Sequence, residues 1–234
     1  KGDKMVVLVT GGAGYIGSDL IRELAIKFPD ETIRILDNMM EEKYVSFWNL
    51  NGKFELIEGD ITKEDDLKRS MKDVETIFDL AGITNAPLSF EKKQLTMDVN
   101  VGGVKKTLKV AMDNGVKKYI YSGTASVYGS ASKPVKEDFD CKPQSPYGES
   151  KLLAEKEIEK AIGQGFNATI LRLGTVYGWS IGMRFDTVID RFTYLACIGS
   201  PLTVWESAIN ERRPYVHIKD AVSGLIFPLG KKMN

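Results

Sequence analysis

The sequence predicts an α/β fold with a doubly wound parallel sheet, in which helices cover both faces. Three observations carry this prediction. At least six short apolar runs alternate with helical segments, a glycine-rich turn follows the first run, and small or polar residues follow several others. The 234 residues suit one large domain, or one domain with a small additional lobe.

The first strand and helix surround the glycine-rich turn. Residues 5–9 are apolar, and Ile16, Leu20 and Leu24 recur at the spacing of a helix on a sheet. The turn has the spacing Gly-x-x-Gly-x-x-Gly, with Gly11, Gly14 and Gly17. Such a turn lets a pyrophosphate approach the backbone N–H groups of the helix N-terminus. These glycines also suit a plain tight turn, but the flanking strand and helix favour a dinucleotide site.

The second strand ends at an acidic residue. We expect this strand at residues 31–36, followed by Asp37, which lies 20 residues after Gly17. A carboxylate at this point accepts hydrogen bonds from the adenosine ribose and repels the additional phosphate of NADP. Because no arginine follows closely, the sequence favours NAD over NADP. The alternative is an aspartate in a surface turn.

Two further strands are expected at residues 54–58 and 76–80. A helix at residues 65–71 separates them, and Thr62 is its candidate N-cap. The pair Ala81-Gly82 follows the fourth strand. Small residues there would let cofactor phosphate and ribose lie close, or would leave room for a packing helix.

The next segments continue the alternation. We expect helices at residues 101–114 and 146–162, and strands at residues 118–122 and 167–172. Ser145 is the expected N-cap of the second of these helices, which begins with a proline.

After residue 172 the pattern loosens. We expect a helix at residues 186–197, short strands at residues 202–204 and 215–217, and a last helix at residues 220–227. The chain is therefore divided into a cofactor-binding domain, residues 1–172, and a partial substrate-binding region continuous with it, residues 173–234.

Composition narrows the class of protein. Lys and Arg number 32, as do Asp and Glu, so the net charge of zero argues against a nucleic-acid partner. No apolar run is long enough to span a membrane, and the first residues lack a signal-peptide pattern. Cys141, Cys197 and the single histidine, His217, offer no metal-binding spacing, so no metal is expected. Two cysteines fit a reduced, cytoplasmic protein.

The candidate chemistry lies after the fifth strand and at the next helix. Ser122 and Thr124 stand at the end of the strand, and Tyr147 and Lys151 lie one helical turn apart. A phenol with a pKa near 10 needs a shift of about 3 units, or roughly 4 kcal/mol, to act as a base at neutral pH. A nearby ammonium and an oxidised nicotinamide ring both favour the phenolate. The alternative is a chance Tyr-x-x-x-Lys spacing.

Taken together, these motifs resemble those of the extended short-chain dehydrogenase/reductases, in the nucleotide-sugar epimerase branch of the UDP-glucose 4-epimerase type. The resemblance is carried by residues 10–17, 59–61, 80–82, Asn100, 121–129, 145–151, 172–178 and 213–220. It implies a Rossmann fold, NAD as cofactor, a nucleotide sugar as substrate and a homodimer formed by the two long helices.

The resemblance also implies residue roles. The catalytic set would be Thr124, Tyr147 and Lys151. The expected NAD contacts are Tyr15, Ile16, Asp37, Asn38, Asp60, Ile61, Leu80, Ala81, Gly82, Asn100, Ser122, Tyr147, Lys151 and Gly174. The expected substrate contacts are Thr124, Tyr147, Thr175 and Arg213, of which Arg213 would hold the diphosphate.

The residues after Thr124 favour one reaction. Sugar 4,6-dehydratases of the family carry an acidic pair there, and decarboxylases usually have Glu at the second position, whereas this chain has Ala125 and Ser126. Neither side chain is an acid or base near neutral pH. We therefore expect 4-epimerisation through a 4-keto sugar. A reductase or dehydrogenase of the same family and a non-catalytic nucleotide-binding protein remain alternatives.

Two departures from the family pattern concern the substrate side. Thr175 stands where an asparagine is usual, and only fourteen residues follow Asp220, where relatives continue with further strands and helices. We expect either a fragment or a reduced substrate lobe, with NAD binding retained.

Overall fold

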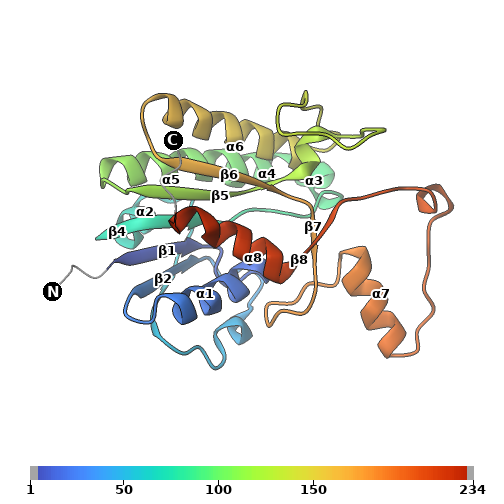
Figure 1. The fold of residues 1–234 in the computed structure, drawn as a ribbon, viewed down its shortest axis with the longest axis horizontal. Helices are drawn as coiled ribbons and strands as arrows, with labels where there is room; N and C mark the ends of the chain where they lie inside the picture. The colour runs from blue at the N-terminus through green and yellow to red at the C-terminus, as the bar shows by residue number, and fades with distance from the viewer. Residues whose placement is uncertain (1–4, 231–234) are drawn as a thin grey trace.

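The computed structural model describes residues 5–230. Its centre is a six-stranded, fully parallel sheet in the order β3-β2-β1-β4-β5-β6 (Figure 1). The strands are β1 (Val6–Thr10), β2 (Thr32–Asp37), β3 (Lys53–Glu58), β4 (Val74–Asp79), β5 (Lys118–Thr124) and β6 (Ala168–Leu173). The order reverses between β1 and β4, where open α/β sheets bind ligands at the carboxyl ends of their strands. The predicted doubly wound sheet is confirmed.

Helices cover both faces of this sheet (Figure 1). One face carries α2 (Glu64–Ser70), α5 (Val104–Asp113) and α6 (Pro146–Gly163), and the other carries α1 (Tyr15–Lys27) and α8 (Ile218–Ile226). Each face has its own core because successive strand residues point to opposite sides. Leu8 packs in the first core, while Val7 and Val9 pack in the second.

Helix α6 begins as the sequence predicts. The Ser145 side chain accepts a hydrogen bond from Gly148 N at 3.1 Å, and Pro146 occupies the first turn. Ala154 and Ile158 are fully buried against the sheet. This packing fixes the helix whose first turns carry the predicted catalytic residues.

Three local predictions need correction. Thr62 is not the N-cap of α2: Lys63 holds that position, and the Thr62 hydroxyl donates to Asp60 Oδ1 instead. The helix expected at residues 101–114 becomes regular only at α5, because a π-helical turn, Asp98–Gly103, precedes it. Residues 202–204 form no strand, since their side chains are exposed and no neighbouring strand pairs with them.

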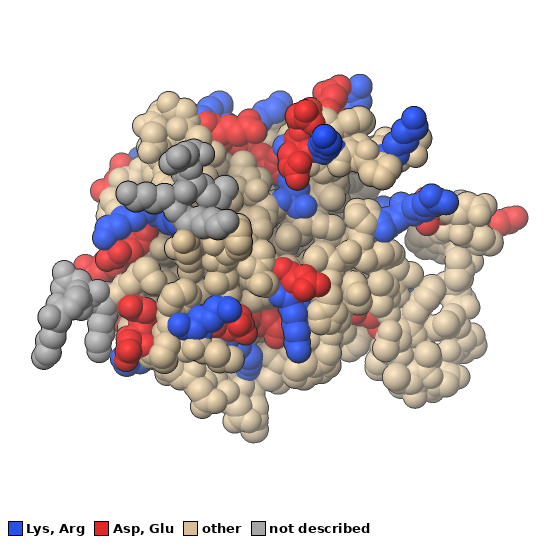
Figure 2. Space-filling model, viewed as in Figure 1, with Lys and Arg blue, Asp and Glu red and all other residues tan. Residues whose placement is uncertain are grey.

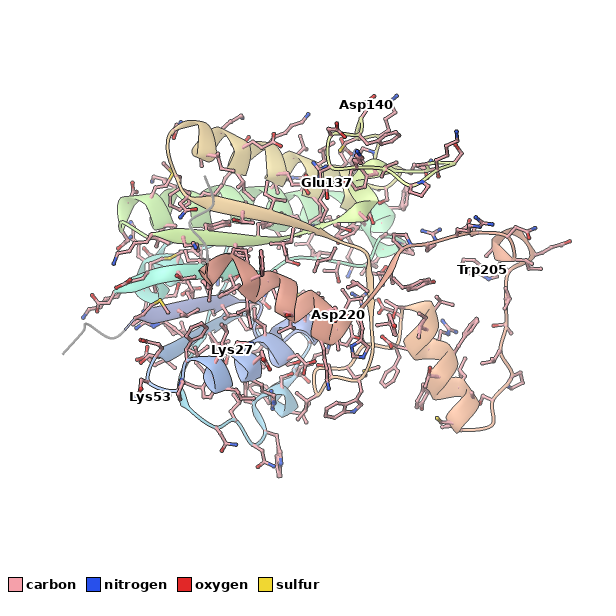
Figure 3. The ribbon with its side chains drawn as sticks, in the orientation of Figure 1. Lys27, Lys53, Glu137, Asp140, Trp205 and Asp220 are labelled. Atoms are coloured by element: carbon pink, nitrogen blue, oxygen red, sulfur yellow. The ribbon has the colours of Figure 1, made fainter. Side chains whose placement is uncertain are left out.

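The part after β6 forms a small sheet and a projecting segment. The sequence did not predict β7 (Thr175–Tyr177), which pairs in parallel with the predicted β8 (Tyr215–His217). Helix α7 (Val188–Cys197) and the following extended segment project from the body, with Trp205 near the tip (Figures 1 and 3). Over α7 the visible surface carries few charged side chains, whereas the main body mixes both signs (Figure 2). The division of the chain at residue 172 stays a prediction.

Two short helices, α3 (Leu88–Glu91) and α4 (Lys93–Met97), complete the chain between β4 and α5. Across residues 5–230 no helix is both long and apolar enough to cross a membrane. The same residues contain no group of three His, Cys, Asp or Glu side chains arranged to hold a metal ion.

Candidate functional site

The glycine turn leaves the start of α1 without a side-chain cap. Gly11 has a φ of 68°, and its N–H donates to Leu36 O at 2.8 Å. A Cβ on Gly17 would lie 2.2 Å from Gly11 O, so only glycine fits there. Gly14 is the N-cap residue of α1 and supplies no acceptor. The N–H groups of the first turn therefore suit an anionic pyrophosphate.

Asp37 ends β2 beside this turn. Its carboxylate accepts hydrogen bonds from Ala13 N at 2.9 Å and Met39 N at 3.0 Å. Burial raises the pKa of Asp37, and these two hydrogen bonds act in the opposite direction. Each oxygen keeps a further lone pair for a ribose hydroxyl. The turn and this carboxylate together fit the adenosine half of a dinucleotide.

Asn38 and Asp60 lie at the same edge of the sheet. Asn38 Nδ2 is 3.4 Å from Asp60 Oδ2, and Asp60 Oδ1 also accepts a hydrogen bond from Thr62 N at 2.8 Å. These contacts connect the ends of β2 and β3 in the region where the sequence predicts cofactor contacts.

A buried aspartate at the end of β4 connects the glycine turn to the centre of the site. Thr10 Oγ1 donates to Asp79 Oδ1 at 2.5 Å, and the Tyr119 hydroxyl donates to the other oxygen. Thr10 Oγ1 also accepts hydrogen bonds from the N–H groups of Leu80 and Ala81, at 3.2 and 3.1 Å. β1 and the segment after β4 are thus held together at their carboxyl ends.

Asn100 anchors the segment that contains Gly82. Its Oδ1 accepts a hydrogen bond from Ile83 N at 2.8 Å, and its Nδ2 donates to Ile83 O and Ser150 Oγ, both at 2.9 Å. Only 1% of the residue is exposed. Because both amide hydrogens are used, Asn100 holds this segment in place; its contact with NAD stays a prediction.

The three predicted catalytic residues lie together on β5 and α6. Thr124 is the last residue of β5; its hydroxyl donates to Ser126 Oγ at 3.2 Å and also acts to lower the pKa of the Tyr147 phenol. Lys151, one helical turn after Tyr147, is 4% exposed, and its Nζ lies 4.2 Å from the centre of the Tyr121 ring. Asp79 acts on this ammonium electrostatically, which connects the trio to the glycine turn through Thr10.

The expected lowering of the Tyr147 pKa by the Lys151 ammonium is not found. Burial raises the pKa of Tyr147, and the groups that act against burial are the Thr124 hydroxyl and the charge of Arg184. The ammonium of Lys151 faces the Tyr121 ring instead. Burial lowers the pKa of Lys151 to about 8, while Asp79 and Glu155 act to raise it.

Arg184 is a site residue that the sequence analysis missed. Its guanidinium forms two hydrogen bonds to Asp186, at 2.5 and 2.6 Å, and one to Thr84 Oγ1 at 3.1 Å. It lies in the segment between β7 and α7, so no local spacing relates it to Tyr147. The charge of Arg184 acts on the Tyr147 phenol only because the tertiary fold brings the two segments together.

Other predicted residues are placed less directly. The Tyr15 hydroxyl donates to Gly178 O at 2.6 Å, and Ile61 is 4% exposed in the core, so the NAD contacts of these two residues stay predictions. Their backbone remains at the carboxyl edge of the sheet, as does that of Ile16. Ser122 lies half-buried on β5.

The predicted substrate residues beyond β6 contact partners in the same part of the chain, after β6. Thr175 begins β7, and its N–H donates to Pro214 O at 2.8 Å; a Cβ on Gly174 would lie 2.9 Å from the same oxygen. Arg213 is exposed and pairs with Glu211 at 2.6 Å. The structure therefore gives Arg213 no contact with the trio among the described residues.

The fold and site define a Rossmann-type, dinucleotide-binding protein with a Thr-Tyr-Lys centre. The family model described as the NAD dependent epimerase/dehydratase family matches residues 7–234. The chain belongs to this family of NAD-dependent nucleotide-sugar enzymes, and the expected cofactor is confirmed at the level of the family.

Two curated relatives match most of the chain. It is 30% identical over 234 residues to a UDP-N-acetyl-alpha-D-glucosaminuronate decarboxylase of Bacillus cytotoxicus, covering 97% of this chain and 72% of the relative. It is 31% identical over 241 residues to a UDP-glucose 4-epimerase of Azospirillum brasilense, covering 95% and 68%.

Solved structures agree with this assignment. A UDP-glucuronic acid 4-epimerase of Bacillus cereus, in complex with UDP-glucuronic acid and NAD, superposes with a TM-score of 0.90 at 29% identity, covering 98% of this chain and 74% of that one. DesIV, a dTDP-glucose 4,6-dehydratase of Streptomyces venezuelae, superposes with a TM-score of 0.88 at 26% identity, covering 97% and 72%.

Proposed function

We propose that the protein is an NAD-dependent 4-epimerase of a nucleoside-diphosphate sugar. Tyr147 would take the proton of the C4 hydroxyl, and Thr124 would hold that hydroxyl in line. NAD, when bound, would accept the C4 hydride and return it to the other face of the 4-keto sugar. Lys151 would hold the nicotinamide ribose. Net redox change is zero, so NAD is not consumed.

One observation carries the choice of reaction. The Thr124 hydroxyl acts on the Tyr147 phenol and favours its ionised form. The short helix that begins directly after Thr124 starts with Ala125 and Ser126, which supply no carboxyl group. Elimination of a C6 hydroxyl needs an additional acid and base near the sugar. Hydride removal and return need only the phenol, the nearby Thr124 hydroxyl and the cofactor, so this arrangement supports epimerisation.

The remaining predicted roles belong to the same proposal. Arg213 and Thr175 would contact the diphosphate and the sugar, for which Arg213 would have to leave Glu211. We also propose a cytoplasmic homodimer through α5 and α6, as the resemblance implies.

The test is direct. The full chain, loaded with NAD, is incubated with UDP-sugars, including a uronic acid, and the C4 epimers are resolved by chromatography. We expect one sugar to interconvert with its C4 epimer, and the Tyr147→Phe variant to lose about 10²- to 10⁴-fold in rate while it still binds NAD. Steady formation of reduced nicotinamide would support a dehydrogenase instead, and release of CO2 a decarboxylase. Activity unaltered in Tyr147→Phe would reject the mechanism.

A further inference from the structure

Helix α6 places a third polar side chain on the stripe that carries Tyr147 and Lys151. Glu155 lies one turn beyond Lys151 and is fully buried. Its Oε2 accepts hydrogen bonds from Arg172 at 2.8 and 2.9 Å. Its Oε1 is also buried, and has no hydrogen-bond partner among the described residues. An unpaired buried carboxylate oxygen is costly, so its retention calls for an explanation.

The free oxygen points toward the strand that carries the catalytic threonine. A Cβ on Gly123 would lie 2.8 Å from Glu155 Oε1, so glycine at this position leaves room for the carboxylate. Gly123 directly precedes Thr124 at the end of β5. The ion pair with Arg172 explains why Oε2 is buried. It does not explain why the other oxygen, Oε1, is buried and directed at β5.

Two acidic and two basic side chains, buried or partly buried, lie around this part of α6, so their formal charges cancel. Asp79 and Glu155 are acidic, and Lys151 and Arg172 are basic. Arg172 also donates to Glu137 O at 2.9 Å, which ties the group to the loop that carries Glu137 (Figure 3). An arginine stays protonated at any ordinary pH. Of the two basic side chains, Lys151 is therefore the one that can lose its proton when a neighbouring charge is removed.

The other titratable groups around Lys151 are phenols. Tyr119 and Tyr121 come from β5, and Tyr147 comes from α6. Burial raises the pKa of all three, so they are neutral near pH 7. Burial also raises the pKa of both carboxyl groups, which their hydrogen-bond partners and Lys151 lower. The negative charge that acts on Lys151 thus comes from Asp79 and Glu155.

We propose that Glu155 is a positioning residue whose unpaired oxygen keeps Lys151 protonated in the neutral pH range. Asp79 supplies the matching charge from β4. This inference rests on the proposed contact between Lys151 and the nicotinamide ribose, because an ammonium donates three hydrogen bonds and its neutral form loses one donor and the charge.

The test follows NADH binding by fluorescence as a function of pH, without any sugar. Wild-type affinity should fall as pH rises through the pKa of Lys151. Glu155→Gln keeps an oxygen that can accept from Arg172 but removes the charge, so the midpoint should move down by about one pH unit. Glu157→Gln is the matched control, because Glu157 lies on the same helix and pairs with Lys105 and Lys160 at the surface. Its midpoint should equal that of the wild type.

Arg172→Gln keeps the proposal testable if Glu155→Gln does not fold. Loss of the guanidinium leaves the buried Glu155 carboxyl without its ion pair and raises the pKa of that carboxyl, so its charge is lost and the midpoint should move down, as in Glu155→Gln. A merely structural ion pair would weaken binding in both variants without moving the midpoint, and that result would overturn the proposal. Persistence of the same midpoint in Lys151→Gln would also overturn it. Failure to epimerise any sugar would count against the proposed function alone, since NADH binding needs no sugar.

Discussion

Ser18 of α1 and Ser180 of the segment after β7 form a buried hydrogen bond of 2.9 Å across 162 residues of sequence. Ser18 Oγ also accepts a hydrogen bond from Gly182 N at 3.1 Å, and Ser180 Oγ donates to Tyr15 O at 3.0 Å. The helix that begins at the glycine turn is thereby joined to the segment that carries Arg184.

Ser18→Ala should weaken this joint. The substitution leaves Gly182 N and Ser180 Oγ with fewer partners in a buried place, which costs about 1–3 kcal/mol of unfolding free energy. Urea unfolding of the variant and the wild type measures this loss of free energy. Ser130→Ala is the control, because Ser130 is exposed and bonds only to Gln144 among the described residues; it should change stability by less than about 0.5 kcal/mol. Equal effects of the two variants would contradict the assignment.

Gly17→Ala and Gly163→Ala should act in opposite directions. The new methyl group at position 17 would meet Gly11 O at 2.2 Å, so the turn must shift, which costs about 1–3 kcal/mol and should abolish NADH binding. At position 163, in the last turn of α6, nothing lies within 4 Å, and the substitution should stabilise by about 0.4–1 kcal/mol. Thermal unfolding and NADH titration check both. Retained binding in Gly17→Ala would remove the glycine turn from the cofactor site.

Asp37→Asn should weaken the discrimination between NAD and NADP. The carboxylate repels an additional phosphate on the adenosine ribose, and the neutral amide does not. We expect the ratio of the two dissociation constants to change by at least about tenfold, or 1.4 kcal/mol. Isothermal titration with each cofactor measures it. Asp60→Asn, at the end of the neighbouring strand, serves as the comparison and should leave the ratio nearly unchanged.

The pH dependence of epimerisation should report on Tyr147 and Arg184. Because burial raises the pKa of Tyr147, the phenolate fraction, and with it kcat/KM, should increase with pH below that pKa. Arg184 acts to lower this pKa, so Arg184→Gln should move the profile toward higher pH. Arg213→Gln should change KM without moving the profile. A shift with Arg213→Gln and none with Arg184→Gln would contradict this placement.

The six sheet strands could be predicted to within a few residues because short β-prone runs alternate with helical segments along the chain, even though the edge strand β3 has no buried residue. β7 could not, since its three residues become a strand only by pairing with β8, about 40 residues later. Residues 202–204 have the composition of a strand, but nothing in a local pattern states that they lie exposed. Local pattern therefore predicts the strands that alternate with helices, and fails where only pairing with a distant segment makes a strand.

The site divides in the same way. Thr124, Tyr147 and Lys151 could be found because strand ends and helical spacing place them together. The direction of the Lys151 ammonium could not, since it depends on the Tyr121 ring and on carboxylates from β4 and α6. Arg184 is positioned by contacts between α1 and a segment far along the chain, so no spacing predicts it. Glu155 could have been found, as it continues the four-residue interval.

Helix α8 has a consequence for any attempt to work with parts of this protein. Its Ile218, Ala221 and Leu225 lie in the same apolar core as Leu20 and Leu24 of α1. A shortened polypeptide that stops at residue 172 would retain the six-stranded sheet except for the last residue of β6, yet would leave the part of this face that α8 covers open to water. Such a product should self-associate. Its recovery as a stable monomer would show that the nucleotide-binding part folds without helix α8.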